Sequence, residues 1–163
     1  MLTKHYMSFF SFLYLLVNVS LFKTYILGDS QACGASAYAP KDWITVCKVG
    51  STVGQWNSRI DSIPLSKGDN VIVFLGSNDW YATPNVVPLL TKLRTKQVHC
   101  VFVGPPLIRG QDGSAQYLKS SVEKDGTCKY LDSRTLHLRQ PDGVHTSEYK
   151  KWLNSAVDAL NVE

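Results

Sequence analysis

Tyr25-Ile26-Leu27-Gly28-Asp29-Ser30 is an apolar run of strand length that ends in glycine, aspartate and serine. A serine at a strand-to-helix turn exposes its hydroxyl above the edge of the sheet, and its own backbone N–H points into the same space. The same tripeptide also occurs in ordinary turns, where Asp or Ser caps a helix. The rest of the chain must decide between these interpretations.

Apolar runs of strand length recur along the chain after this first one. Several are continuous in Val, Ile and Phe, which is typical of parallel strands that are buried on both faces. The predicted strands are residues 24–27, 43–49, 71–75, 98–103 and 127–131.

Segments with an amphipathic helical pattern separate most of these strands and follow the last one. Helices are predicted at residues 53–63, 85–95, 114–124 and 147–160. Such alternation implies right-handed βαβ units. The sequence therefore predicts an α/β protein, a three-layer α/β/α sandwich around a mostly parallel five-stranded sheet. The active crevice of such a sheet lies at the carboxyl ends of its strands.

The composition fits one globular domain and argues against several classes of function. The chain has 163 residues, 44% of them hydrophobic and 18% charged, so a single core is expected and disorder is not. The net charge is +4, but the basic residues are scattered along the chain, and we expect no nucleic-acid partner. No Gly-x-Gly-x-x-Gly follows the first strand, which argues against a dinucleotide cofactor.

The four cysteines, Cys33, Cys47, Cys100 and Cys128, have spacings of 14, 53 and 28 residues. These spacings match no zinc pattern, so we expect no structural metal. Cys47 and Cys100 fall within predicted strands, and we interpret the cysteines as small buried thiols. Disulfides are the alternative if the domain is exported, and four cysteines can pair in three ways.

The N-terminal segment, residues 1–22, differs in composition from the domain that we expect over residues 23–163. Lys4 and His5 precede sixteen uncharged, largely apolar residues at positions 7–22. This pattern is typical of a signal peptide, and the run is close to the length of a short membrane anchor. We expect an exported or membrane-anchored protein. The alternative is a cytoplasmic protein in which this segment packs on the domain.

Polar residues follow the predicted strands at four places, and each supplies one part of an acyl-transfer site. Ser30 offers a nucleophile and Gly50 an unobstructed backbone N–H. Asn78 offers a carboxamide donor after the third strand. Asp142 precedes His145 by three residues across a glycine turn, so the carboxylate can reach one ring nitrogen and leave the other facing the site. Each motif alone is weak, but together they contain every part that acyl chemistry needs.

These four places, in this order, resemble the hallmark blocks of the SGNH or GDSL hydrolase family. The matching residues are Gly28-Asp29-Ser30, Gly50, Gly76-Ser77-Asn78-Asp79 and Asp142-Gly143-Val144-His145. The resemblance extends from residue 24 to about residue 160. It implies a flavodoxin-like sheet with strand order 2-1-3-4-5 and a serine esterase or lipase site that uses no metal or organic cofactor.

The resemblance also implies a role for each matched residue. Ser30 is the expected nucleophile, His145 the general base, and Asp142 the residue that orients His145. The backbone N–H groups of Ser30 and Gly50 and the side-chain amide of Asn78 are the expected oxyanion hole. Asp29 is expected to hold the turn rather than to act in catalysis.

Substrate preference is the part of the function that the sequence defines least. Trp80, Tyr81 and Arg109 follow strand ends and are candidate substrate-binding residues. The chain has no insertion that resembles a lid, which favours small acyl groups, and we expect a carbohydrate acetylesterase. The alternatives are a short-chain lipase, lysophospholipase or thioesterase and, in another class, a non-catalytic binding module on the same fold. The oligomeric state stays open.

Overall fold

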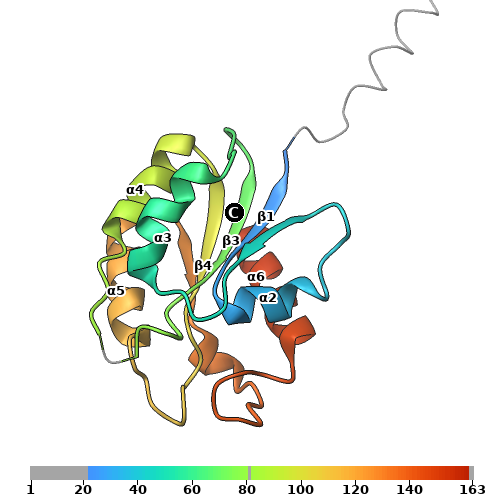
Figure 1. The fold of residues 1–163 in the computed structure, drawn as a ribbon, viewed down its shortest axis with the longest axis vertical. Coiled ribbons are helices and arrows are strands. Elements are labelled where there is room, and N and C mark those ends of the chain that lie inside the picture. Colours follow the sequence, from blue (N-terminus) through green and yellow to red (C-terminus); the bar gives the residue numbers. More distant parts are fainter. Residues whose placement is uncertain (1–21, 81, 162–163) are drawn as a thin grey trace, which may run out of the picture.

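The computed structural model describes residues 22–80 and 82–161, in which strands and helices alternate along the chain (Figure 1). The first half contains β1 (Thr24–Gly28), α2 (Ser30–Ser36), β2 (Ile44–Cys47), α3 (Val53–Arg59), the short 3-10 helix η1 (Ile60–Ser62) and β3 (Asn70–Phe74). The second half contains α4 (Val87–Lys96), β4 (His99–Val103), α5 (Ala115–Asp125), β5 (Lys129–Leu131), the 3-10 helix η2 (Ser133–Leu136) and α6 (Tyr149–Asn161).

The five strands form one parallel sheet in the order β2-β1-β3-β4-β5, which confirms the predicted fold class and strand order. In the register of the sheet, Gly28 at the end of β1 lies between Cys47 of β2 and Phe74 of β3. The carboxyl ends of these strands therefore meet at one edge. The segments that follow them carry the candidate residues to that edge.

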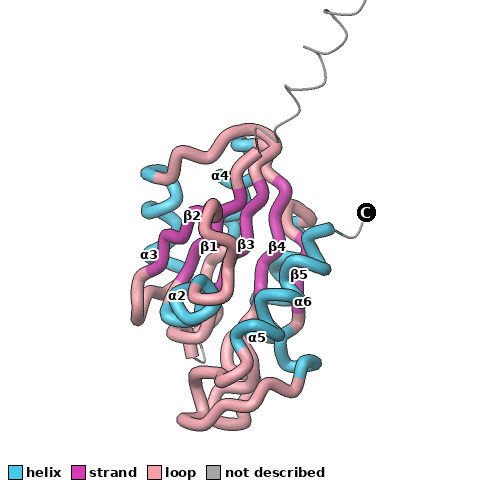
Figure 2. Tube along the Cα trace, turned by 90° about the vertical axis from the view of Figure 1, so that its right-hand side faces the viewer, coloured by secondary structure: helices cyan, strands magenta, loops and turns pink. Residues whose placement is uncertain are grey.

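Side chains alternate between the two faces of the sheet, and each face has its own hydrophobic core. Tyr25 and Leu27 belong to the core under α3, α4 and α5, whereas Ile26 belongs to the core under α2 and α6. Figure 1 shows the two groups of helices on opposite sides of the sheet, and Figure 2 looks onto the side of α2 and α6. Because both faces are buried, the central strands are continuous apolar runs.

Helices α2 and α3 depart from the prediction. The sequence pattern gave no helix over residues 30–36, because Ser-Gln-Ala-Cys-Gly-Ala-Ser contains few large apolar residues to mark a periodic face. The predicted helix over residues 53–63 is an α-helix only to Arg59 and continues as η1. Strand β2 is shorter than predicted, since the chain turns at Lys48, whose carbonyl accepts the N–H of Ser51 at 3.1 Å.

Two disulfides join the four cysteines, so the interpretation of separate buried thiols is wrong. Cys33 in α2 pairs with Cys47 at the end of β2, and Cys100 in β4 pairs with Cys128 just before β5. Both bridges join segments that the fold has already brought together, with Cα atoms 5.5 and 4.7 Å apart. Sequence spacing carries no information about such contacts, because they depend on how the strands are ordered in the sheet.

The expectations for the N-terminal segment fall almost entirely outside the described residues. Residues 1–21 are not described, and β1 begins at Thr24. In the part of the chain that is described, no helix combines the length and the apolar character that a membrane span requires.

We predict that the double variant Cys100→Ala, Cys128→Ala unfolds at a lower temperature than the wild type. This bridge closes a loop of 28 residues, and loops of that size are worth roughly 3 kcal/mol through the unfolded state. The expected fall in Tm is about 5–12 °C. Thermal unfolding followed by circular dichroism measures it. If the reductant-treated wild type and the variant both melt like the untreated wild type, the bridge does not contribute to stability.

Candidate active site

Ser30 is the first residue of α2 and directly follows the turn that ends β1. Gly28 makes this sharp turn possible: its φ is +148°, and a Cβ placed there would lie 1.9 Å from the carbonyl oxygen of Phe74. Asp29 caps α2, since its Oδ1 accepts the N–H of Gln31 at 2.9 Å. The turn thereby presents the Ser30 side chain at the carboxyl edge of the sheet.

His145 and Asp142 lie beside Ser30, although they come from the loop before α6. His145 Nε2 is 3.0 Å from Ser30 Oγ, and His145 Nδ1 is 2.8 Å from Asp142 Oδ2. The other oxygen of Asp142 accepts the backbone N–H groups of Val144 and His145. The pKa of Asp142 lies far below its ordinary value. The largest cause is the hydrogen bond from the His145 ring, followed by those from the backbone N–H groups of His145 and Val144. Asp142 is therefore ionised and orients the imidazole toward the serine.

Gln31 connects the serine turn to the histidine loop, and sequence reasoning missed it. Its side chain is buried beside Ser30, and its Nε2 donates to the carbonyl of Val144 at 2.9 Å. Its Oε1 accepts the hydroxyl of Tyr149 at 3.0 Å. Burial raises the pKa of Tyr149 to about 12, so the hydroxyl stays a donor at neutral pH. Gln31 and Tyr149 thereby fix the distance between α2 and the loop that carries His145.

The three expected oxyanion donors lie on the turns after β1, β2 and β3. Among the described residues, no group accepts a hydrogen bond from the backbone N–H of Ser30 or of Gly50. Gly50 has a φ of +74° and is exposed. The Asn78 amide is already engaged: its Nδ2 donates to the carbonyl of Ser51 at 3.0 Å and to Asp29 Oδ2 at 3.2 Å. These two acceptors determine which end of the carboxamide carries the nitrogen.

Two buried carboxylates, Asp29 and Asp79, accept hydrogen bonds from the residues around the site. Burial raises the pKa of Asp29 to about 7, while the N–H of Gln31 lowers it, the charge of Asp79 raises it and the nearby His145 lowers it again. Burial also raises the pKa of Asp79, whose oxygens accept the N–H of Val53 at the start of α3. Sequence reasoning treated Asp29 only as a turn residue and did not predict its bond to Asn78.

The structure describes two of the three candidate substrate-binding residues, and these two lie side by side. Trp80 is 44% exposed, and the guanidinium of Arg109 lies 5.4 Å from the centre of its ring. Tyr81 lies outside the described residues. A small hollow beside Trp80 is lined by Gly76, Pro105 and Ile108, among others. A larger, open hollow near Arg94 lies at the other end of the sheet, where β4 begins, and is remote from Ser30.

Comparison with solved structures shows which known proteins have a similar fold. A GDSL-like lipase from Bacteroides thetaiotaomicron superposes with a TM-score of 0.60 at 14% identity, over 83% of this chain and 85% of that one. A member of the lipolytic G-D-S-L family from Veillonella parvula also gives 0.60, at 13% identity over 84% and 97%.

The chain has the SGNH/GDSL hydrolase fold. The C-terminal catalytic domain of peptidoglycan O-acetyltransferase A from Streptococcus pneumoniae shares it, with a TM-score of 0.60 and 16% identity over 85% of this chain and 92% of that one. No protein-family model and no curated protein matches the sequence. The resemblance of the four short blocks is thus supported by the SGNH/GDSL fold rather than by overall sequence similarity.

We predict that Gln31→Ala lowers kcat by about 10–100-fold, because a displacement of His145 by about 1 Å is enough for such a loss. Tyr149→Phe keeps the bond from Gln31 to Val144 and should have a smaller effect in the same direction. Steady-state kinetics on a simple ester, with melting curves for both variants, measures the change. A fall in stability with unchanged kcat would show that Gln31 does not position the histidine.

We predict that raising the pH from 4 to 7 changes the stability of the wild type less favourably than that of Asp29→Asn. Asp29 has a pKa of about 7 when folded and an ordinary value of 3.8. The folded state therefore binds the proton more tightly, and stability falls as the pH rises from about 4 to about 7. The slope of the unfolding free energy against pH should differ between the two proteins by up to about 1.4 kcal/mol per pH unit.

Urea unfolding at several pH values between 4 and 8 measures the two slopes. The variant removes the titrating carboxyl of Asp29 itself, so the difference between the two slopes reports the proton that Asp29 binds. Equal slopes in the wild type and in Asp29→Asn would contradict the assignment of a raised pKa to Asp29.

Proposed function

We propose that this protein is a serine esterase that hydrolyses small acyl esters, with acetyl groups on carbohydrates as its preferred substrates. The observation that carries the proposal is the unbroken chain of contacts from Ser30 Oγ through the His145 ring to Asp142, at 3.0 and 2.8 Å. A hydroxyl, an imidazole and an ionised carboxylate in this order are the groups that nucleophilic acyl transfer uses.

The reaction follows from this order in two steps. His145 Nε2 takes the proton of Ser30 as Oγ attacks the ester carbonyl, and Asp142 stabilises the imidazolium that forms. The negative charge on the carbonyl oxygen is held by the N–H groups of Ser30 and Gly50 and by the amide of Asn78. His145 then returns the proton to the departing alcohol. A water molecule repeats the sequence on the acyl-enzyme and releases the acid.

Asn78 has to present an N–H to the oxyanion although its nitrogen already lies near two acceptors. As the carbonyl oxygen acquires charge it becomes a stronger acceptor than the neutral carbonyl of Ser51, and the bond from Nδ2 shifts to it. Such a bond is stronger in the transition state than in the ground state, which is the condition for accelerating the chemical step.

Two observations support a small acyl group. The hollow beside Trp80 is small. Pro105 and Ile108 give it apolar walls. One structural neighbour is the catalytic domain of a peptidoglycan O-acetyltransferase, a protein named for acetyl transfer on a glycan. Acetyl esters of carbohydrates combine both features.

We also propose that the protein works outside the reducing cytoplasm. Two disulfides among the described residues favour an oxidising compartment. The apolar residues 7–22 would direct export or anchor the protein in a membrane. Lys23 precedes β1, and Ser30 lies beyond its other end, so an anchor would join the domain at the end of the sheet remote from the site.

We predict that Ser30→Ala and His145→Ala each lower kcat by at least about 1,000-fold without unfolding the domain. Asn78→Ala should lose about 100- to 1,000-fold. On p-nitrophenyl esters, wild-type activity should fall steeply from acetyl to octanoyl, and acetylated sugars should be hydrolysed. Circular dichroism on each variant controls for folding.

The same experiment separates the alternatives. Activity that rises with acyl chain length would favour a lipase or lysophospholipase. A folded wild type with no activity on any ester and no reaction with a fluorophosphonate would favour a non-catalytic binding module.

A further inference from the structure

Trp80 and Arg109 come from different loops and meet at the rim of the candidate active site. Trp80 lies in the segment after β3, two residues beyond Asn78. Arg109 lies in the segment after β4, and its backbone N–H donates to the carbonyl of Gly143 at 2.7 Å. Gly143 in turn precedes His145 by two residues. The pair therefore borders both the oxyanion segment and the histidine loop.

Both residues are held in a backbone conformation that L-residues rarely adopt. Trp80 has a φ of +46° and Arg109 a φ of +50°. A bulky side chain in this region persists only where its surroundings enforce it, and such outliers gather at functional sites. The carbonyl of Trp80 packs closely on Gly113, where an added Cβ would lie 2.8 Å from it.

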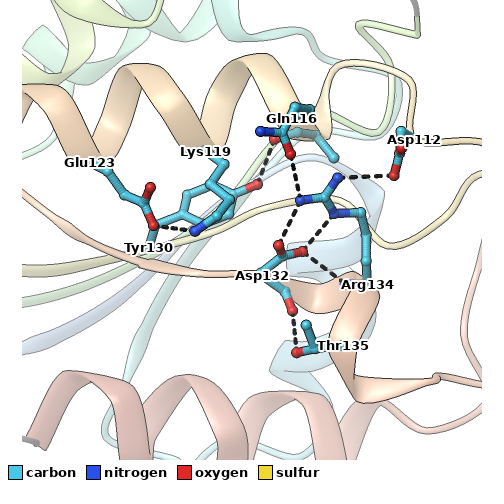
Figure 3. A network of polar contacts seen from close by, with 9 residues as sticks. Asp112, Gln116, Lys119, Glu123, Tyr130, Asp132, Arg134 and Thr135 are labelled. Atoms are coloured by element: carbon cyan, nitrogen blue, oxygen red, sulfur yellow. Dashed lines mark hydrogen bonds and ion pairs between the residues drawn. The ribbon is translucent and has the colours of Figure 1, made fainter.

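Hydrogen bonds at several points hold the segment that carries Arg109. Ile108 and Gln111 exchange two backbone hydrogen bonds of 3.0 Å, and Ser114 Oγ donates to the carbonyl of Gly76 at 2.9 Å. At its far side, Asp112 accepts a hydrogen bond from Arg134, which also forms a two-pronged ion pair with Asp132 (Figure 3). The Arg109 backbone is thus fixed before any substrate arrives.

The guanidinium of Arg109 has no acceptor among the described residues, although two carboxylates lie in the neighbouring segments. Asp112 is paired with Arg134. Asp142 directs one oxygen to the His145 ring and the other to backbone N–H groups of its own loop. Toward the residues that the structure describes, the Arg109 guanidinium therefore keeps its donors unused, and it lies 5.4 Å from the centre of the Trp80 ring.

We infer that Arg109 and Trp80 form a subsite that binds a carboxylate group of the substrate, so that the preferred esters are anionic. This inference rests on the proposed esterase function. The planar guanidinium fork matches a carboxylate with two parallel hydrogen bonds, whereas the indole offers an apolar face to a sugar ring or an acyl chain. The carboxylate can belong to the alcohol part or to the acyl part of the ester.

Two pairs of substrates distinguish these sources. For the alcohol part, the comparison is a singly acetylated methyl glucuronoside against the same acetyl ester of methyl glucoside. For the acyl part, it is p-nitrophenyl hemisuccinate against p-nitrophenyl butyrate. In one of the two pairs, the wild type should prefer the anionic member by at least about fivefold in kcat/KM, a modest value because the subsite is exposed. Raising the salt concentration should weaken that preference.

Arg109→Gln should abolish the preference, because kcat/KM should fall much further for the anionic member of the pair than for the neutral one. The matched control is Arg59→Gln, which removes the same charge from another arginine stacked on a tryptophan. Arg59 lies 5.7 Å from the Trp56 ring, at the far end of α3 from the site. Arg59→Gln should retain the preference. Arg109→Lys keeps the charge without the planar fork and should retain only part of it.

Three outcomes would overturn the inference. The first is a wild type that hydrolyses the neutral esters and shows no preference in either pair, which leaves the proposed esterase function intact. The second is an equal loss of preference in Arg59→Gln and Arg109→Gln, which would reduce the effect to net charge. The third is a wild type that hydrolyses none of the four esters and is not labelled by a fluorophosphonate, since the esterase proposal then fails and the subsite fails with it.

Discussion

The hydrogen bond of 3.0 Å between His145 Nε2 and Ser30 Oγ joins side chains that are 115 residues apart. Its length depends on the parallel sheet, which brings the turn after β1 close to the loop before α6. It also depends on α6 itself, because Tyr149 at its start holds Gln31, and Gln31 holds the histidine loop. A shift of α6 relative to α2 would therefore separate the Ser30 hydroxyl from the His145 ring.

Close packing around the serine turn leaves little room for such a shift. A Cβ at Gly28 would collide with the backbone of β3, and one at Gly34 would lie 2.2 Å from the Tyr149 ring. Underneath, Asp29 is fully buried and is satisfied by donors from α2 and from the Asn78 side chain. Burying this carboxylate costs stability, but its oxygens hold the turn and Asn78 in one geometry.

Much of the fold could be predicted because its strands are buried on both faces and are therefore continuous runs of apolar residues. The placement of Ser30, Asn78 and His145 at one edge followed from the same argument, since each comes after a strand or before the last helix. Helix α2 could not be predicted in this way, because it packs through Ala32 and Ala35 rather than through large apolar side chains. The disulfides, the Gln31 link and the contact of Trp80 with Arg109 join segments distant in sequence. They depend on loop geometry that no local pattern encodes.

The most direct test of the activated serine is to treat the folded protein with a fluorophosphonate and locate the adduct by mass spectrometry of its peptides. Ser30 is half-buried and sits 3.0 Å from the imidazole, while other serines of the described chain have no histidine in hydrogen-bond contact. We predict a single adduct on Ser30 that is absent in His145→Ala and in denatured protein. An adduct on another residue, or an unmodified Ser30 in folded wild-type protein, would contradict the assignment.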